Sequence, residues 1–535
     1  MRFSLTLLTT KSKIIIGWLK EFHKKSLVIS SEERSYKNFL AELKKDFDYK
    51  PNSSNFFLLV PLMNDLGTMK IVTQIAYKMA VEENFSIKYF YVHSGIDTKL
   101  LRNSKVGFFI NQFLQFNYFL KNKLCRIYQV SKKDIILFNY FRPSYNIKNE
   151  ERVSTKKELL DINYSNIPIG ELIFDTYLRF RSKPDLDLTD NCLYDIIGYF
   201  KTLIDYWNKG LNRFPISRLL IPYTAYHHWG IPAYTCLAKN IDVVTFGSVN
   251  YVFSRPTLAH PYHSKNFHLY PEIFSQLKNK QECIQQAKEV LNSRLGGNID
   301  SGTSYMKESA FSDNADILFS PPENNYWCVV FLHCFFDSPH IYGKSIFSDF
   351  YEWVVYILNH AAKNPNTIFY IKEHPNALPD NEDVIKSLKN TYSQFNNIVF
   401  LPGKVSNKQI AAKKPNAVFT VYGTVAHEFA ALKIPVVVAG ENPQSMYGFI
   451  HKPSNIEEFK EMLNAIGSLK LPESYEEDEI YEFFYIHYQY YSKKYHSKNF
   501  DKKLDLVNGI INLPTDIPCS DLFFNNILLK EDCYE

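Results

Sequence analysis

The sequence predicts an α/β protein with two doubly wound domains, each a parallel sheet covered by helices, that face each other across a cleft. Strand-like apolar runs alternate with amphipathic helical patterns in two separate stretches of the chain, as parallel sheets require. The chain has 535 residues, and a single hydrophobic core stops growing at roughly 250 to 300 residues. We therefore expect two substantial domains with extensions.

Composition narrows the class of protein. Hydrophobic residues make up 45% of the chain and charged residues 22%, so wholesale disorder is excluded. The formal charge of +5, from 61 basic and 56 acidic residues, gives little attraction to nucleic acid, and we expect no nucleic-acid partner. No two of the eight cysteines have CxxC spacing, which favours reduced thiols in a cytoplasmic protein.

Residues 1–50 are expected to form an N-terminal helical extension. Its apolar runs are too short for the roughly 20 residues that cross a bilayer, so no transmembrane helix is predicted. Two interpretations of residues 14–22 are open. The preferred one is a helix packed on the main body; the other is an amphipathic helix lying peripherally on the inner face of the cytoplasmic membrane, next to Lys24 and Lys25.

The first domain is expected over residues 51–270. A buried strand at 56–61, a turn that contains Asp65, an amphipathic helix and a second strand ending near His93 form a βαβ unit. Further strands are predicted at residues 134–141, 218–223 and 242–248. A helical linker is expected over 271–325, where the pattern changes and the loop-forming "GGNIDSGTS" follows.

The second domain is expected over residues 326–455, followed by a helical tail over 456–535. Its five strands are predicted within "WCVVFLHCFF", "TIFYIK", "NIVFL", "AVFTVY" and "PVVVAG", with helices between them. In open parallel sheets, ligands bind beyond the carboxyl ends of the strands. The loops after these strands are therefore where chemistry is expected.

The strand "TIFYIK" ends in Lys372 and is followed by Glu373, His374 and Pro375. Proline cannot continue the ladder and favours an extended conformation in the residue before it, so His374 is held in a defined direction. An imidazole and an ammonium at this place suit a phosphate. The alternative is a polar strand end whose histidine caps a neighbouring loop.

The strand "AVFTVY" is followed by Gly423 and Thr424, and Glu428 lies one turn later. The glycine permits close approach of the backbone to a ligand, the helix that starts at Thr424 attracts an anion, and Glu428 can accept from a ligand hydroxyl such as a ribose. A threonine that only caps its own helix is the alternative. Both groups are expected at the same sheet edge, where they can bind one phosphate from two sides.

These residues carry a resemblance. A His-Pro pair at a strand end, followed about 50 residues later by a threonine that opens a helix before "LKIPVVVAG", resembles the C-terminal half of bacterial capsule-polysaccharide glycosyltransferases of the GT-B type. Kdo transferases and bacterial sialyltransferases are the relatives it suggests, and CDP-glycerol glycerophosphotransferases share a similar signature. The resemblance covers residues 327–448 and implies a GT-B-like fold of two Rossmann-like domains, with His374, Pro375 and Thr424 on the nucleotide phosphate.

The resemblance also has implications for the first loop of the second domain and departs from the family at two places. It places Asp337 and Ser338, in "DSPHIYG", in a loop that closes over the nucleotide, although a simple turn explains that sequence too. Gly423 and Thr424 stand where the families often have Ser-Ser or Ser-Thr, and "KEHP" replaces the commoner "KPHP".

The predicted function is a metal-independent inverting glycosyltransferase without a cofactor. A nucleotide-activated sugar, with a CMP-sugar such as CMP-Kdo favoured, is the expected donor, and a cell-surface polysaccharide or glycolipid is the expected acceptor. Lys372 and His374 offset charge on the leaving phosphate, and a group of the first domain accepts the acceptor's proton. Asp65 and His228 are the preferred candidates for this base; His227, His93 and His260 are others.

Two alternatives stay open. A glycerophosphotransferase or a sugar epimerase can be built on the same paired domains. A noncatalytic nucleotide-sugar-binding component of a capsule assembly complex also fits the aromatic tail and the basic N-terminal segment.

Overall fold

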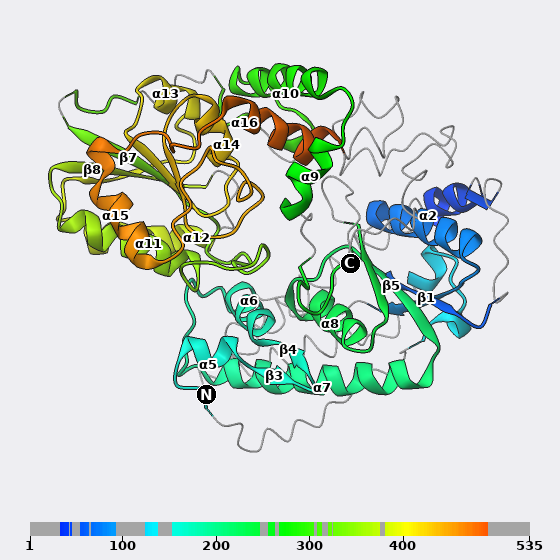
Figure 1. Ribbon diagram of the computed structural model, residues 1–535. Helices are drawn as coiled ribbons and strands as arrows, with labels where there is room; N and C mark the ends of the chain where they lie inside the picture. Colours follow the sequence, from blue (N-terminus) through cyan, green and yellow to red (C-terminus); the bar gives the residue numbers. More distant parts are fainter. Residues whose placement is uncertain are drawn as a thin grey trace.

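The computed structural model describes most of the two predicted domains. The described residues are 33–41, 43–44, 54–63, 66–91, 124–136, 152–246, 255–262, 267–303, 308–312, 319–323, 325–374 and 380–490. Asp65, His93, Pro375 and the segment 14–22 lie outside them. Two parallel sheets, one in each half of the molecule, form the framework (Figure 1).

The first sheet has the described strand order β2-β1-β5-β6, with all pairs parallel. Its strands are β1 (Phe57–Leu62), β2 (Ser86–Tyr91), β5 (Ile216–Ile221) and β6 (Asp242–Thr245). Alternation of buried strands with α2 (Leu66–Glu82) and α8 (Ile231–Leu237) gives the predicted βαβ units. Of the strand expected at 134–141, Ile135 forms an isolated parallel bridge to Tyr89, and residues 137–141 are outside the description.

The remaining elements of this half cover the sheet and lead to the second half. They are η1 (Lys132–Asp134), α5 (Lys156–Leu160), β3 (Asn163–Tyr164), β4 (Ile167–Pro168), α6 (Gly170–Arg181), α7 (Asn191–Arg213) and the π-helix η2 (Tyr226–Gly230). Buried side chains of the helical residues 33–41 and 43–44, among them Tyr36 and Leu43, belong to the same core as the sheet.

The second sheet has the order β11-β10-β7-β8-β9, again all parallel. Its strands are β7 (Tyr326–Phe331), β8 (Thr367–Lys372), β9 (Ile398–Leu401), β10 (Ala417–Thr420) and β11 (Val436–Val438). The helices are α11 (Phe350–Ala362), α12 (Asn381–Tyr392), α13 (Asn407–Ala412), α14 (Val425–Ala431) and α15 (Ile456–Asn464). The chain order reverses between β7 and β10, as in a Rossmann-like sheet. The predicted fold class is confirmed.

Two cores flank the second sheet. Trp353, Ile357 and Phe459 of α11 and α15 pack in one of them. The other contains η3 (Phe267–Leu269), from the end of the expected first domain, and α9 (Tyr270–Ser275), which begins at the last residue of that domain. It also contains segments expected as linker and tail, which are α10 (Lys280–Leu295), α16 (Glu477–Phe484) and η6 (Tyr485–Tyr490). Figure 1 shows α10 and α16 side by side on this half. The short turns η4 (Ser301–Thr303) and η5 (Ile466–Ser468) complete the described elements.

The two halves meet through polar contacts that the loop after β7 makes with η2 and α6 of the first half. After β5, the Tyr226 hydroxyl donates to Asp337 Oδ1, 3.0 Å away in the loop after β7. The buried carboxylate of Asp175 on α6 lies 2.6 Å from His340 Nδ1. These contacts place the carboxyl ends of the two sheets opposite each other.

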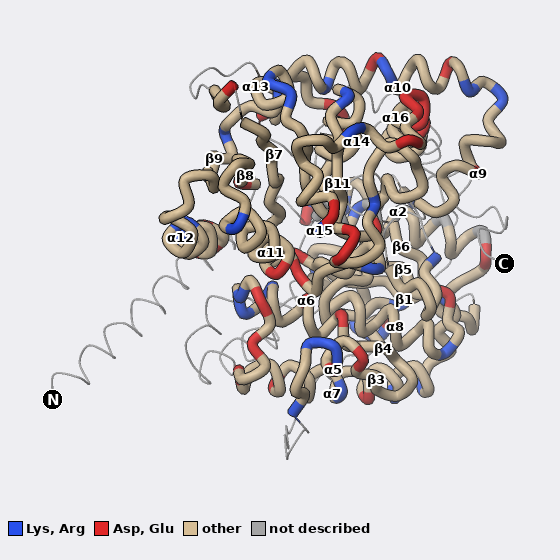
Figure 2. Tube along the Cα trace, turned by 60° about the vertical axis from the view of Figure 1, so that its left-hand side comes forward, with Lys and Arg blue, Asp and Glu red and all other residues tan. Residues whose placement is uncertain are grey.

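The distribution of charged residues agrees with the nearly balanced composition. Both basic and acidic residues are scattered over the described part of the chain in Figure 2. None of the helices searched in the described part combines the length and apolarity that crossing a bilayer requires.

Candidate functional site

A cavity of about 270 Å³ opens at the carboxyl edge of the second sheet, where the strand order reverses. The loops after β7, β8 and β10 line it, and α10 and residues 303 and 309–311 close it from the side. This is the place where open α/β sheets bind ligands. Five of the predicted site residues line it together: Lys372, His374, Gly423, Thr424 and Glu428.

Lys372, the last residue of β8, brings a buried cation to this cavity. The residue is only 3% exposed, and its Nζ donates to the Gly403 carbonyl at 2.9 Å. None of the described carboxylates forms an ion pair with it within 4.0 Å. Burial lowers the pKa of Lys372 to about 8, so the ammonium is still mostly protonated at neutral pH. The cavity therefore contains positive charge that the described protein leaves without an anionic partner.

Two imidazoles lie on the same cavity wall. Burial lowers the pKa of His374, and Lys372 lowers it further, so this imidazole is neutral at pH 7. Burial also lowers the pKa of His333 to about 3. Because the Val421 amide donates to His333 Nε2 at 3.1 Å, the proton of this neutral ring is on Nδ1.

Gly423 and Thr424 connect β10 to α14. A Cβ atom on Gly423 would lie 2.7 Å from Thr420 Oγ1, so packing requires glycine here. Thr424 has helical dihedral angles, φ −59° and ψ −25°, and its side chain does not cap the helix. Since α14 has only seven residues, its dipole is small, and Lys372 is the stronger attraction for an anion.

Glu428 lies on the first turn of α14 and is 3% exposed. Burial raises its pKa, while Arg294 and a hydrogen bond from the Thr424 side chain act in the opposite direction. The Glu428 carboxylate therefore lies in the cavity wall between a hydroxyl donor and a guanidinium.

Asp337 and Ser338 are not among the described residues of the cavity wall. Asp337 instead accepts from Tyr226 of the other half, and Ser338 is 3% exposed. The same loop contributes Tyr342 to the wall, and the Tyr342 ring contacts that of Tyr422 with centroids 4.9 Å apart.

His228 lies on the π-helix after β5, on the other side of the cleft. Its ring is parallel to that of Tyr226, with centroids 6.0 Å apart, and Tyr226 contacts Asp337. Burial lowers the pKa of His228 to about 3, and Arg179 contributes, so the ring is a neutral imidazole at pH 7. It is outside the cavity wall. Asp65 and Pro375 are outside the described residues.

Four polar side chains at the cavity or between the two halves have functional positions that the sequence did not predict: His333, Arg294, Asp175 and His340. His333 is the second residue after β7, as His374 is after β8, so the rule that singled out His374 would also have found it. Arg294, in a segment interpreted as a linker, gave no such signal. The buried pair of Asp175 and His340 joins the two halves, and the carboxylate outweighs burial and raises the pKa of His340.

In the described part of the chain, no group of three or more His, Cys, Asp or Glu side chains is placed to hold a metal ion. The polar groups that line the cavity can form hydrogen bonds and ion pairs. They include an ammonium, neutral imidazoles, hydroxyls and a carboxylate. Such a set suits a ligand that carries both an anion and hydroxyl groups.

No family model and no curated protein matches this chain. Among solved structures it is similar to two KpsC proteins of Thermosulfurimonas dismutans. The β-Kdo 2,7 transferase has 13% identity over 52% of this chain and 79% of that one, with a TM-score of 0.28. The β-Kdo 2,4 transferase has 11% identity over 50% and 79%, with a TM-score of 0.30.

A UDP-GlcNAc 2-epimerase of Methanocaldococcus jannaschii has 10% identity over 80% of this chain and 98% of that one, with a TM-score of 0.27. Likeness at these TM-scores supports no conclusion about activity. The assignment of two facing Rossmann-like domains, the GT-B arrangement, rests on the strand orders and the contacts between the halves.

Proposed function

We propose that this protein is an inverting glycosyltransferase that binds a nucleotide-activated sugar in the cavity of the second domain. The observation that carries the proposal is Lys372, a buried cation at the cavity without an ion pair among the described carboxylates. Burying an ammonium without a counter-ion is costly, and an anionic ligand relieves that cost. A phosphate next to Lys372 and His374 is the anion that this edge of a Rossmann-like sheet suits best.

The residues of the cavity then have distinct roles. The phosphate lies against Lys372 and His374 near Gly423 and Thr424, with Pro375 holding the direction of the histidine. Glu428 accepts hydrogen bonds from the ribose hydroxyls. Asp337 and Ser338 belong to the loop that covers the nucleotide, and this loop contributes Tyr342 to the cavity wall.

In the reaction, an acceptor hydroxyl oxygen forms a bond to the anomeric carbon as the bond from that carbon to the phosphate oxygen breaks. The electron pair of the broken bond leaves with the nucleotide, where the Lys372 ammonium and a hydrogen bond from His374 stabilise it. The hydroxyl proton passes to a base of the first domain, either Asp65 or His228.

The donor class follows from the motif resemblance to Kdo transferases and bacterial sialyltransferases, which use CMP-activated sugars. We therefore expect a CMP-sugar such as CMP-Kdo as donor and a cell-surface polysaccharide or glycolipid as acceptor. A cytoplasmic enzyme of this kind meets its acceptor at the inner face of the membrane.

A thermal-shift screen against CMP, CDP, UDP and GDP tests the proposal, with inorganic phosphate as the reference ligand. A nucleotide that binds only the folded protein raises its apparent stability. We expect stabilisation by CMP beyond that by phosphate, and slow release of free CMP from CMP-Kdo without acceptor.

The outcomes separate the alternatives. Product analysis that finds an isomerised nucleotide sugar identifies an epimerase, and glycerophosphate transfer from CDP-glycerol identifies a glycerophosphotransferase. Donor binding with neither hydrolysis nor transfer supports a noncatalytic component. Stabilisation by none of the four nucleotides contradicts the assignment of the cavity.

A further inference from the structure

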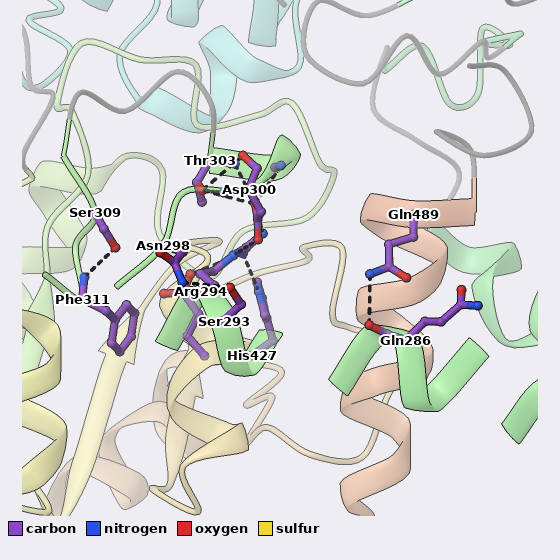
Figure 3. Close-up of polar contacts among 12 residues, drawn as sticks. Gln286, Ser293, Arg294, Asn298, Asp300, Thr303, Ser309, Phe311, His427 and Gln489 are labelled. Atoms are coloured by element: carbon purple, nitrogen blue, oxygen red, sulfur yellow. Dashed lines mark hydrogen bonds and ion pairs between the residues drawn. The ribbon is translucent and has the colours of Figure 1, made fainter. Parts of the chain in front are cut away.

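Arg294 is a fully buried cation at the side of the cavity, and it comes from α10, outside the sheet. It is 2% exposed. Its Nε and Nη2 donate to the two carboxylate oxygens of Asp300 at 2.7 and 2.8 Å, which is a bidentate pair (Figure 3). Its Nη1 lies 3.4 Å from Glu428 Oε1 and 3.3 Å from His427 Nε2.

Aromatic rings of the C-terminal segment fix the guanidinium further. Its carbon lies 4.7 Å from the ring centroid of Phe484 and 4.5 Å from that of Tyr488. Contacts of this kind favour a planar guanidinium over an ammonium. The position of Arg294 therefore depends on α16 and η6 as well as on α10.

The same side chain fixes the loop that closes the cavity. Asp300 Oδ1, held by Arg294, accepts from the main-chain amides of Gly302 at 2.9 Å and Thr303 at 3.1 Å. A Cβ atom on Gly302 would lie 2.4 Å from the Tyr488 ring and 2.8 Å from Arg294 Nη2, so the loop packs directly on the pair. Thr303 lines the cavity.

Arg294 contacts Glu428 only through Nη1, at 3.4 Å, because its Nε and Nη2 are bound to Asp300. The Thr424 side chain also donates a hydrogen bond to Glu428. An ionised carboxylate offers about four lone-pair sites. Glu428 thus has acceptor capacity left on the side of the cavity that it lines.

We propose that Arg294 is a positioning residue that holds the Glu428 carboxylate to accept hydrogen bonds from the ribose hydroxyls of the nucleotide, an inference that rests on the proposed function. The helix expected as a linker and the aromatic tail are then parts of the nucleotide site. A purely structural arginine would stabilise the fold but leave recognition of the ribose unchanged.

The test is the preference for ribose over deoxyribose, measured by calorimetry on the full chain with CMP and 2′-deoxy-CMP, and again with UDP and 2′-deoxy-UDP. Hydrogen bonds to a charged group are worth about 1.5 to 3 kcal/mol, so wild type is expected to bind the ribonucleotide at least about tenfold more tightly. Arg294→Lys, Arg294→Gln and Glu428→Gln are each expected to reduce this preference to about threefold or less. Binding of the deoxynucleotide should change by less than about threefold, because the phosphate contacts remain.

Lys280→Gln is the matched control, since it removes an exposed cation from the start of the same helix and should keep the wild-type preference. If wild type prefers the ribonucleotide and Glu428→Gln loses that preference while a folded Arg294 variant keeps it, the inference is overturned and the proposed function stands. If Arg294→Gln does not fold, the preference for ribose is measured on Arg294→Lys alone, because lysine retains the charge but cannot form the bidentate pair. If wild type binds none of the four nucleotides, the proposed function is overturned and the inference with it.

Discussion

Each sheet has a buried lysine on one strand, and the two lysines differ in whether a carboxylate neutralises their charge. Lys88, on β2 of the first sheet, is 7% exposed, and its Nζ lies 2.7 Å from Asp134 Oδ1. Lys372, on β8 of the second sheet, is 3% exposed and has no ion pair among the described carboxylates. The first lysine is neutralised by the protein, whereas the second faces a cavity. Similar topology thus gives one buried lysine that is neutralised in the middle of its strand and one, at a carboxyl edge, that can accept an anion.

The imidazoles of the two halves also differ in their surroundings. His374 lies on the cavity wall near Lys372, whereas His228 lies outside that wall, near Arg179 and among aromatic rings that include those of Tyr226 and Trp229. A parallel sheet places loops at its carboxyl edge but does not decide their chemistry. Donor binding is therefore expected at the second sheet and proton acceptance at the first.

Exchanging each lysine for methionine gives the largest expected contrast. Lys372→Met should lower nucleotide affinity and transfer by about 100- to 1000-fold, because a preorganised cation is removed from the phosphate. Its free energy of unfolding should stay equal or rise, since a buried charge without an ion pair is lost. Calorimetry and urea unfolding measure the two effects.

Lys88→Met is the matched control. It leaves the partly buried Asp134 without its partner and should cost about 1 to 3 kcal/mol of unfolding free energy. Nucleotide affinity should not change. If both variants lose affinity equally, the contrast between the sheets is wrong.

Replacing each histidine by alanine sharpens the contrast between donor and acceptor sides. His374→Ala should reduce both donor hydrolysis and transfer by about 10- to 100-fold, because it removes a hydrogen bond to the leaving phosphate. His228→Ala should reduce transfer and leave nucleotide affinity unchanged if His228 is the base. Parallel assays with and without acceptor separate the two steps. Full transfer activity in His374→Ala would contradict the phosphate site.

The pKa of Lys372, lowered to about 8 by burial, predicts a pH dependence. As pH rises from about 7 to 9.5, nucleotide affinity should fall by up to tenfold per unit above about 8, because the ammonium loses its proton. Lys372→Arg should show no such fall, since the guanidinium stays protonated. Calorimetric titrations across this pH range measure the affinity. A wild-type affinity that does not change through pH 8 would contradict the assignment of Lys372 to the phosphate.

Stability changes in the opposite direction over the same pH range. Between about pH 8 and the ordinary lysine pKa of 10.5, the unfolded chain retains a proton that the folded protein has lost. The contribution of Lys372 to the free energy of unfolding therefore rises with pH. Comparison of urea unfolding of wild type and Lys372→Met isolates this contribution.

A pair of glycine variants gives the smallest expected effect. Gly423→Ala brings a methyl group near Thr420 Oγ1 and should weaken nucleotide binding by about three- to tenfold as the cavity wall shifts. Gly230→Ala, after β5, brings Cβ within 2.7 Å of the Thr224 carbonyl and 2.5 Å of the Leu172 side chain. It should lower the melting temperature without changing the affinity of the protein that remains folded. Equal affinity loss in both variants would remove the distinction between the edges.

The sequence predicted the second sheet well, because each of its strands is a short buried run between turn signals. The strand expected in "TIFYIK" is β8, Thr367–Lys372, and all five expected strands are present. The meeting of Lys372, His374 and Thr424 at one cavity could also be anticipated, since the parallel strands of one sheet end at the same edge. Their roles remain predictions.

Other parts of the site had no local signal. Arg294 lies on a polar helix, where an arginine ordinarily indicates a solvated face, and its burial depends on rings about 190 residues later in the chain. Asp175 and His340 come together only when the two halves meet. Pairings of this kind depend on how separate elements pack, and single-sequence periodicity carries no information about that.

A crystal structure of the protein with CMP tests the central claim most directly. The account predicts the phosphate in the cavity of the second sheet, within about 3 Å of Lys372 Nζ and a ring nitrogen of His374, with the ribose toward Glu428. A nucleotide bound at the edge of the first sheet, or with its phosphate away from Lys372, would contradict it.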